Sequence, residues 1–226
     1  MEIILIGLAV FIVLGSLLMF LSRDPNKKGM GLLEKGDYRN AVAKFERVLA
    51  KNPKNWEAYG YLGDTYRRLG RYEKAIDSYK TSLSYNPEAI DSYEGLALSY
   101  VDKGFRFNEA IVLLGQTRDI LKDDALLLNE TRIFYLEALS WVYFQKGDTA
   151  RAMKYFDEAY PLWQKDFQNG LNEFDPYFSE VHYRFGVLLN HRGEKEKARG
   201  EFEKAVRCAP MSIFAKKSQE EIEKLK

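Results

Sequence analysis

Side chains suited to catalysis or metal binding are few in this chain. Of its 226 residues, two are histidines and one is a cysteine. His182 and His191 are nine positions apart, off the spacing that pairs two metal ligands on one helix face. No basic cluster marks Cys208 as a reactive thiolate. We therefore predict no metal site, and structural roles for these three residues.

Motifs of the common enzyme classes are also missing. The sequence holds no phosphate-binding loop, dinucleotide fingerprint or nucleophile elbow. Its many Lys and Glu residues, as in the run 194–197, follow spacings typical of solvated helix faces. The formal net charge is +1, so bulk charge does not indicate nucleic acid as a partner. We predict that the chain is not an enzyme, needs no cofactor and takes no small-molecule substrate.

The first 23 residues have a composition of their own. Residues 3–21 form an uncharged apolar run whose 19 residues would rise about 28 Å as a helix. That length is close to the roughly 30 Å hydrocarbon core of a bilayer. A cleaved signal peptide normally has a basic start, a shorter apolar stretch and small residues at the cleavage site. The chain starts with Met1-Glu2 and the run ends in Phe20-Leu21, so a retained transmembrane anchor over 1–23 is favoured.

Basic residues follow the apolar run, and none precedes it. Arg23, Lys27 and Lys28 come directly after the run. The positive-inside rule therefore predicts a single-pass protein of the cell (inner) membrane, with residues 24–226 on the cytoplasmic side. The periplasmic or extracytoplasmic side stays the alternative, since one short tail gives a weak charge contrast.

Beyond residue 24 the sequence repeats itself. An Ala is followed four residues later by a large side chain at five places: Ala41/Phe45, Ala75/Tyr79, Ala110/Leu114, Ala152/Phe156 and Ala198/Phe202. A Gly precedes each Ala by five or six residues, at positions 36, 70, 104, 147 and 193. Gly ends a helix without steric cost, and a small Ala lets two helices approach closely. Pro marks the other junctions, so the unit is helix, Gly turn, helix, Pro turn.

This unit resembles the tetratricopeptide repeat. Residues 59–66 read Tyr59-x-x-Leu62-Gly63-x-x-Tyr66, and Ala75, Tyr79 and Pro87 follow in register. Ser140 stands where the fourth repeat would have its Gly, and the first half of repeat one is degenerate. The resemblance covers about residues 25–210. With the apolar run before it, the whole chain resembles membrane-anchored repeat proteins of the bacterial type.

The resemblance implies an all-α fold, a right-handed α-solenoid of about five helix pairs behind the anchor. The expected repeats cover approximately 25–54, 55–88, 89–128, 131–176 and 177–210. Residues 211–226 carry Met211, Phe214, Ala215, Ser218, Ile222 and Leu225 on one stripe, which predicts a C-terminal capping helix. The aromatic insertion 160–178 is interpreted as a prolonged helix that turns back and buries its rings. A second contact surface or a membrane-facing patch is the alternative.

Proteins of this family bind peptides or helices in a concave groove lined by the first helix of each pair. Transferred to this sequence, the groove positions are Glu57, Asp64, Arg67, Asp91, Glu94, Leu98, Phe134, Glu137, Trp141, Phe144, Tyr183 and Asn190. This groove is acidic in its N-terminal half and aromatic in its C-terminal half. It predicts a partner segment with basic residues near one end and apolar anchors near the other. The alternative is that the acids are only solvated and the aromatic rings belong to the core.

The resemblance favours a membrane-tethered scaffold that binds other proteins and assists the assembly or regulation of a membrane-associated complex. A self-associating structural component, or a regulatory subunit of an envelope enzyme or protein-quality machine, is the alternative. One subgroup of the family clamps the C-terminal carboxylate of chaperones with Lys, Asn and Arg. The corresponding positions here hold Asn26, Met30, Tyr61, Asp91 and Gly95, so we do not expect that activity.

Overall fold

The computed structural model describes residues 24–121, 130–168 and 178–226. These residues form eleven helices and no strand. The helices are α2 (Lys27–Glu34), α3 (Tyr38–Lys51), α4 (Trp56–Arg68), α5 (Tyr72–Tyr85), α6 (Ile90–Asp102), α7 (Phe107–Leu121), α8 (Glu130–Lys146), α9 (Thr149–Gln168), α10 (Ser179–His191), α11 (Lys195–Cys208) and α12 (Ile213–Lys224).

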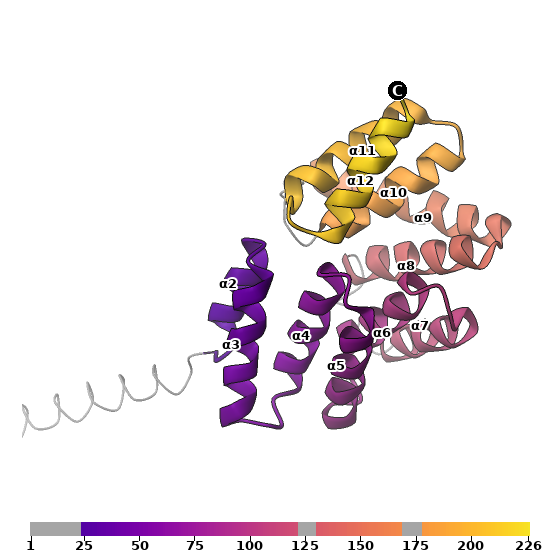
Figure 1. Cartoon of the computed structure of the whole chain (residues 1–226). Helices are drawn as coiled ribbons and strands as arrows, with labels where there is room; N and C mark the ends of the chain where they lie inside the picture. Colours follow the sequence, from indigo (N-terminus) through magenta and orange to yellow (C-terminus); the bar gives the residue numbers. More distant parts are fainter. Residues whose placement is uncertain (1–23, 122–129, 169–177) are drawn as a thin grey trace, which may run out of the picture.

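Consecutive helices pack as pairs, and the pairs follow one another along a curved stack (Figure 1). The predicted all-α solenoid is confirmed in this respect. The predicted anchor over 1–23 lies outside the described residues. None of the helices within 24–121, 130–168 and 178–226 is long and apolar enough to cross a bilayer.

The turn inside each pair depends on a glycine, as the repeat pattern predicts. All five turn glycines, at positions 36, 70, 104, 147 and 193, have positive φ angles between 71° and 87°. A side chain at such a backbone conformation would be strained, whereas glycine adopts it freely. The chain can therefore reverse within a few residues and lay the second helix against the first.

The five small-and-large pairs of the repeat pattern form the core. Every Ala of these pairs is fully buried, and each large partner is at most 1% exposed. The ring of Tyr79 lies between two glycines of neighbouring helices. A Cβ at Gly63 would stand 2.5 Å from this ring, and one at Gly95 would stand 2.2 Å away. Small residues at these positions are thus what lets α4, α5 and α6 meet around one aromatic side chain.

Two details near the ends of the stack, one helix boundary and one side chain, differ from the sequence-based expectation. Asp24-Pro25 suggests a helix start directly at these residues, yet α2 begins at Lys27 with Asn26 as its N-cap. The Asp24 carboxylate instead accepts a hydrogen bond from the Asn26 amide at 2.8 Å. At the other end of the chain, Met211 is 76% exposed and does not join the predicted apolar stripe.

The rest of that stripe is confirmed by the capping helix α12. Phe214, Ala215 and Ser218 are buried, and α12 packs on α10 and α11. The hydroxyl of Ser212 caps the helix by accepting a hydrogen bond from the Ala215 amide at 3.0 Å. Polar capping and one apolar face together explain why the chain turns into a helix here.

Two other features of the repeats match their sequence. Helix α9 runs on as far as Gln168, and the rings of Trp163 and Phe178 are buried against each other at 4.9 Å between centroids. This agrees with the interpretation of buried rings for these two residues, while 169–177 lie outside the described part. Ser140, at the place of the expected Gly, is buried and donates a hydrogen bond to the Ala152 carbonyl at 2.8 Å.

A glycine substitution tests the close approach around Tyr79. In Gly63→Ala the new methyl group must displace a ring that Gly95 holds from the other side. We expect a loss of about 2 kcal/mol in the free energy of unfolding, measured by urea titration. Gly200→Ala is the control, because nothing lies within 4 Å of its added Cβ in α11. There alanine should stabilise the protein by about 0.5–1 kcal/mol, and equal effects at both sites would contradict the packing argument.

Candidate functional site

Two of the predicted groove residues, Arg67 and Glu137, belong to a buried cluster of charges, here called the inner-face cluster: Arg67, Asp102, Glu137, Glu180 and Arg184. Its members come from α4, α6, α8 and α10, the first helices of four successive pairs. Arg67 pairs with Asp102 at 3.3 Å between Nη1 and Oδ2, and with the carboxylate of Glu180. One guanidinium therefore connects the second repeat to the third and the fifth.

Arg184 is the second centre of this cluster. It is fully buried, and its Nη1 lies 3.2 Å from both carboxylate oxygens of Glu137. Its Nη2 lies 3.8 Å from Asp102 and 3.9 Å from Glu180. Two arginines and three carboxylates thus share one desolvated site, where each charge needs its neighbours to replace water.

Burial and charge act in opposite directions on these groups. Burial disfavours the charge of Arg184, but Glu137, Glu180 and Asp102 outweigh it and raise the pKa of the guanidinium. Burial likewise opposes the charge of Glu180, yet the arginines outweigh it and lower the pKa of this carboxyl. At Glu137 burial prevails over Arg184 and raises the pKa from 4.5 to about 7.

Aromatic rings cover the cluster on one side. Trp141 is 4% exposed, and its indole N–H donates to Asp102 Oδ1 at 3.3 Å. Its ring stacks on Phe144 and meets Tyr183 edge-on, both at 5.9 Å between centroids. Tyr183 in turn lies 6.0 Å from Phe214 of α12. The aromatic half of the predicted groove is therefore a connected layer that includes the C-terminal helix.

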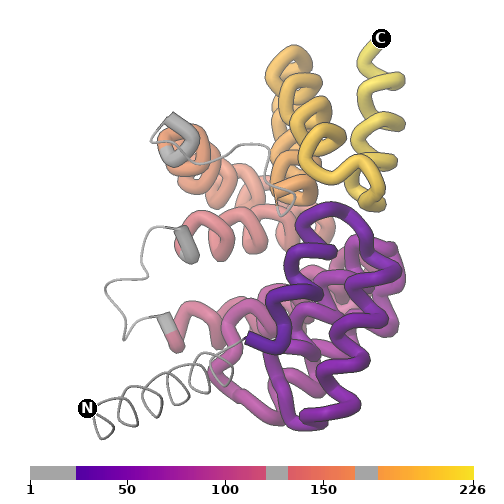
Figure 2. The backbone as a smooth tube through the Cα atoms, turned by 90° about the vertical axis from the view of Figure 1, so that its left-hand side faces the viewer, coloured from indigo at the N-terminus to yellow at the C-terminus, as the bar shows by residue number. Residues whose placement is uncertain are grey.

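Helix α12 also reaches the N-terminal half of the stack. The guanidinium carbon of Arg67 lies 5.8 Å from the centre of the Phe214 ring. Lys217 donates to the Tyr72 hydroxyl at 3.5 Å. The curved stack thus brings its last helix beside the end of α4 and the start of α5. Figures 1 and 2 show the yellow C-terminal helix close to the indigo and purple N-terminal half. The sequence predicted a cap for the last repeat and not this second contact.

The twelve predicted groove residues fall into three groups by exposure. Arg67, Leu98, Glu137 and Trp141 are buried; Asp64, Glu94, Phe134, Phe144, Tyr183 and Asn190 are partly buried; Glu57 and Asp91 are exposed. The buried group holds the repeats together, so the residues left for contact with a partner come from the other two. The role of all twelve in partner binding stays a prediction.

Three acidic residues of the N-terminal half stand in different surroundings. Asp64 accepts a hydrogen bond from the Tyr79 hydroxyl at 2.7 Å, and Glu57 accepts one from the Asn26 side chain at 3.3 Å. Oε1 of Glu94 is buried and has no hydrogen-bond partner among the described residues. Burial, with the charges of Asp91 and Glu137, raises the pKa of Glu94 well above its ordinary value.

The remaining candidates for chemistry have structural roles. His182 is fully buried, and its Nδ1 lies 2.6 Å from Glu201 Oε2. The Tyr160 hydroxyl donates to the other oxygen of Glu201 at 3.2 Å. Cys208 is buried. Within the described ranges no group of three or more His, Cys, Asp or Glu side chains could hold a metal ion.

Three members of the cluster are not among the predicted groove residues: Asp102, Glu180 and Arg184. Asp102 ends α6, four residues beyond the predicted Leu98, and Arg184 lies between Tyr183 and Phe185 in α10. The only available signal is the spacing of Glu180 and Arg184 by four residues, which allows an ion pair on one helix. That spacing is shared by many exposed pairs, so it could not indicate burial.

Removing one arginine tests the cluster as a structural link. Arg67→Met leaves Asp102 and Glu180 with a single buried guanidinium, so we expect a loss of about 3–5 kcal/mol in the free energy of unfolding. Arg71→Met, at an exposed site in the next turn, should change it by no more than about 0.5 kcal/mol. Similar urea midpoints for the two variants would contradict this role.

The raised pKa of Glu137 predicts a pH dependence of stability. Because the folded carboxyl holds its proton more tightly than the unfolded one, its contribution to the unfolding free energy falls as pH rises from about 4.5 through 7. The decline should not exceed about 3 kcal/mol. Glu137→Gln removes this titration, so its stability curve should fall less across that window than the wild-type curve. Parallel curves would contradict the assignment; the exposed Glu109→Gln is the control.

Comparison with known proteins supports the repeat assignment. The tetratricopeptide-repeat family matches residues 26–90, 63–104 and 135–160. BBSome complex member BBS4 of Bos taurus is 23% identical over 208 residues, which cover 81% of this chain and 38% of that protein. Cytochrome c-type biogenesis protein CycH of Bradyrhizobium diazoefficiens is 31% identical over 86 residues, or 38% of this chain and 23% of that protein. The chain thus spans less than half the length of either relative.

Solved structures show the same architecture. A thermophilic TPR (tetratricopeptide-repeat) protein of Thermus thermophilus has a TM-score of 0.56 and 23% identity, covering 87% of this chain and 96% of that one. A tetratricopeptide-repeat protein of Parabacteroides merdae has a TM-score of 0.58 and 20% identity, covering 88% and 69%. At these identities the likeness shows the fold alone. The chain therefore contains tetratricopeptide repeats, stacked as an all-helical solenoid of the kind that generally mediates protein–protein interaction.

Proposed function

We propose that this chain is a membrane-tethered scaffold that binds a partner polypeptide on the inner face of its repeats. Support comes from the repeats themselves and from the apolar run at 3–21, whose length suits a bilayer. The partner segment would carry Lys or Arg at one end and apolar anchors at the other. Its binding would assist the assembly or regulation of a complex at that membrane.

The observation that carries this proposal is the unsatisfied acid on α6. Glu94 keeps a buried carboxylate oxygen without a hydrogen-bond partner among the described residues, beside the exposed Asp91. The nearby arginines are already shared by three other carboxylates. An ammonium or guanidinium from a partner would supply the missing donor and favour ionised Glu94, which burial now disfavours.

Apolar anchors would find the partly buried rings one repeat further along. Phe144 is stacked on Trp141 and meets His191 edge-on at 5.2 Å between centroids. Tyr183 is likewise partly exposed. Aromatic rings held by their neighbours offer contact area with little loss of rotamer entropy on binding.

Tethering lowers the affinity that such a site needs. A scaffold confined to a membrane meets other proteins of that membrane at a raised effective concentration. Binding by a short peptide segment would then suffice for recruitment. We place the repeats on the cytoplasmic side, following the basic residues after the apolar run.

The inner-face site is tested by capture from detergent-solubilised membranes. The double substitution Asp91→Asn with Glu94→Gln replaces both carboxyl groups by amides of the same shape, which cannot become negatively charged beside a cationic partner group. We expect about tenfold less of at least one bound polypeptide, measured by quantitative mass spectrometry, because a charge-assisted contact is lost. Glu88→Gln with Glu109→Gln alters two exposed acids elsewhere and should change nothing. Unaltered capture of every polypeptide by the first variant would refute the site.

The tether is tested separately by alkaline carbonate extraction of membranes. The full chain should stay in the membrane pellet, and a variant without residues 3–21 should appear in the supernatant, because the apolar run has the length needed to span. Release of the full chain by carbonate would refute tethering and leave the inner-face site unaffected.

A further inference from the structure

We infer that a second surface of the solenoid docks on the anionic headgroups of a phospholipid membrane. This surface, here called the basic face, consists of Lys27 and Lys28 on α2 with Lys44, Arg47 and Lys51 on α3. The inference rests on the proposed tether, which would hold this surface near a bilayer. The clustering of the five cations is a feature of the structure and does not depend on the tether.

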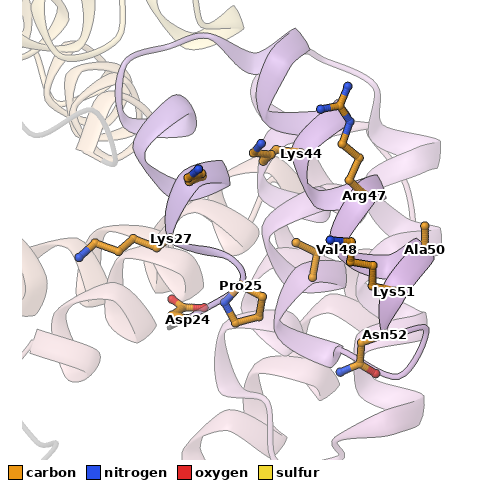
Figure 3. A pocket seen from close by; sticks show the side chains of 10 residues that line it. Asp24, Pro25, Lys27, Lys44, Arg47, Val48, Ala50, Lys51 and Asn52 are labelled. Carbon is orange, nitrogen blue, oxygen red and sulfur yellow. The ribbon is translucent and has the colours of Figure 1, made fainter. Parts of the chain in front are cut away.

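The basic face follows from the register of α3 and the position of α2. Lys44, Arg47 and Lys51 are separated by three and four residues, so they lie on one side of their helix. They line a common depression with Lys27 and Lys28, and Figure 3 shows the side chains around it. Two helices that meet through the core at Phe45 thus bring five cations to one depression.

These cations are not neutralised by the protein. None of the five forms an ion pair with a carboxylate of the described residues, and Asp24 is the one acid among them that lines the depression. The whole chain carries a formal net charge of only +1, so this surface is a local excess. Like charges at helical spacing repel each other, and an anionic surface would relieve that repulsion.

The position of the basic face in the sequence, directly after the apolar run, favours membrane headgroups as its ligand. The apolar run ends at Leu21, and the described residues begin at Asp24, which lies at the rim of the same depression. A chain that leaves a bilayer at residue 21 can extend at most about 21 Å before it reaches Lys27 at the start of α2. This short connection keeps the basic face close to the membrane, where its cations can approach the headgroups to within a Debye length.

Docking would fix the orientation of the whole stack. A single spanning helix leaves a folded domain free to swivel, whereas a second contact on α3 holds it in one pose. The attraction amounts to about fivefold in binding per Lys or Arg close to an anionic leaflet. Val48 and Ala50 also line the depression, and their small side chains allow the headgroups to approach closely.

The experiment uses the full chain reconstituted in nanodiscs of zwitterionic phosphatidylcholine, with or without phosphatidylglycerol. A thiol is placed on the basic face by Ala50→Cys and at an exposed reference site on α9 by Ala150→Cys. Its reaction with a neutral water-soluble maleimide is timed; the natural Cys208 is buried. We expect the reaction at position 50 to slow about tenfold when phosphatidylglycerol is present, with no change at position 150. Raised salt should abolish the difference.

Charge reversal separates docking from mere proximity to the disc. The substitutions Lys44→Glu, Arg47→Glu and Lys51→Glu should remove the protection at position 50. Lys154→Glu, Lys195→Glu and Lys216→Glu impose the same change of net charge at exposed sites elsewhere and should keep it. Protection that survives reversal of the basic face, or that never appears with phosphatidylglycerol, would overturn the inference.

Failure of the tether can be told apart from failure of the basic face. If the chain does not enter zwitterionic discs, the anchor is refuted. If the same chain still binds phosphatidylglycerol vesicles through the basic face in a salt-sensitive way, the inference about the basic face stands. If it binds neither kind of membrane, both proposals fail. Equal protection of position 50 by a short DNA duplex without any membrane would identify a soluble polyanion instead and overturn the inference.

Discussion

Two buried guanidinium groups hold the inner face of this solenoid together. Arg67 and Arg184 lie out of water and must be met by carboxylates, which three helices supply. Removing a charge from water costs several kcal/mol unless its partners are well placed, so the cluster constrains the spacing of the first helices. Repeats of a solenoid mainly contact their sequence neighbours, whereas this link ties the second repeat to the fifth. Helix α12 lies against the same cluster, because the ring of its Phe214 packs beside Arg67.

This constraint divides the inner face into a part where opposite charges meet and a part where like charges meet. Around Arg184 the carboxylates of Glu137, Glu180 and Asp102 balance the guanidinium and the ring of Trp141 lies beside it, although its Nε and Nη2 have no hydrogen-bond partner among the described residues. Around Glu94 the neighbouring charges, Asp91 and Glu137, carry the same sign as its own carboxylate. At this acidic part a cationic partner group can add binding free energy. The basic face has the opposite sign, so the two surfaces favour different partners.

The features that could be predicted from the sequence are those set by local size and backbone conformation. A glycine five or six residues before an alanine marks a positive-φ turn, and the alanine marks a close approach; both hold in all five pairs. The ion pairs could not be predicted in this way. A charged residue in a helical pattern gives no sign of whether its side chain meets water or another helix. Arg67 and Glu137 read as groove residues for this reason, whereas the structure buries both. Asn26, the N-cap of α2, is buried and its side chain donates to Asn55 and Glu57, a tertiary contact that no local pattern encodes.

The most direct measurement places a photo-crosslinking amino acid at position 91, beside Glu94, in cells that contain the full chain in its own membrane. We predict crosslinks to a polypeptide segment in which Lys or Arg lies near large apolar residues. The same probe at position 196, on the exposed side of α11, should give none of these products. Identical products from both positions, or no protein crosslinked from position 91, would contradict the assignment of the inner face as the binding surface.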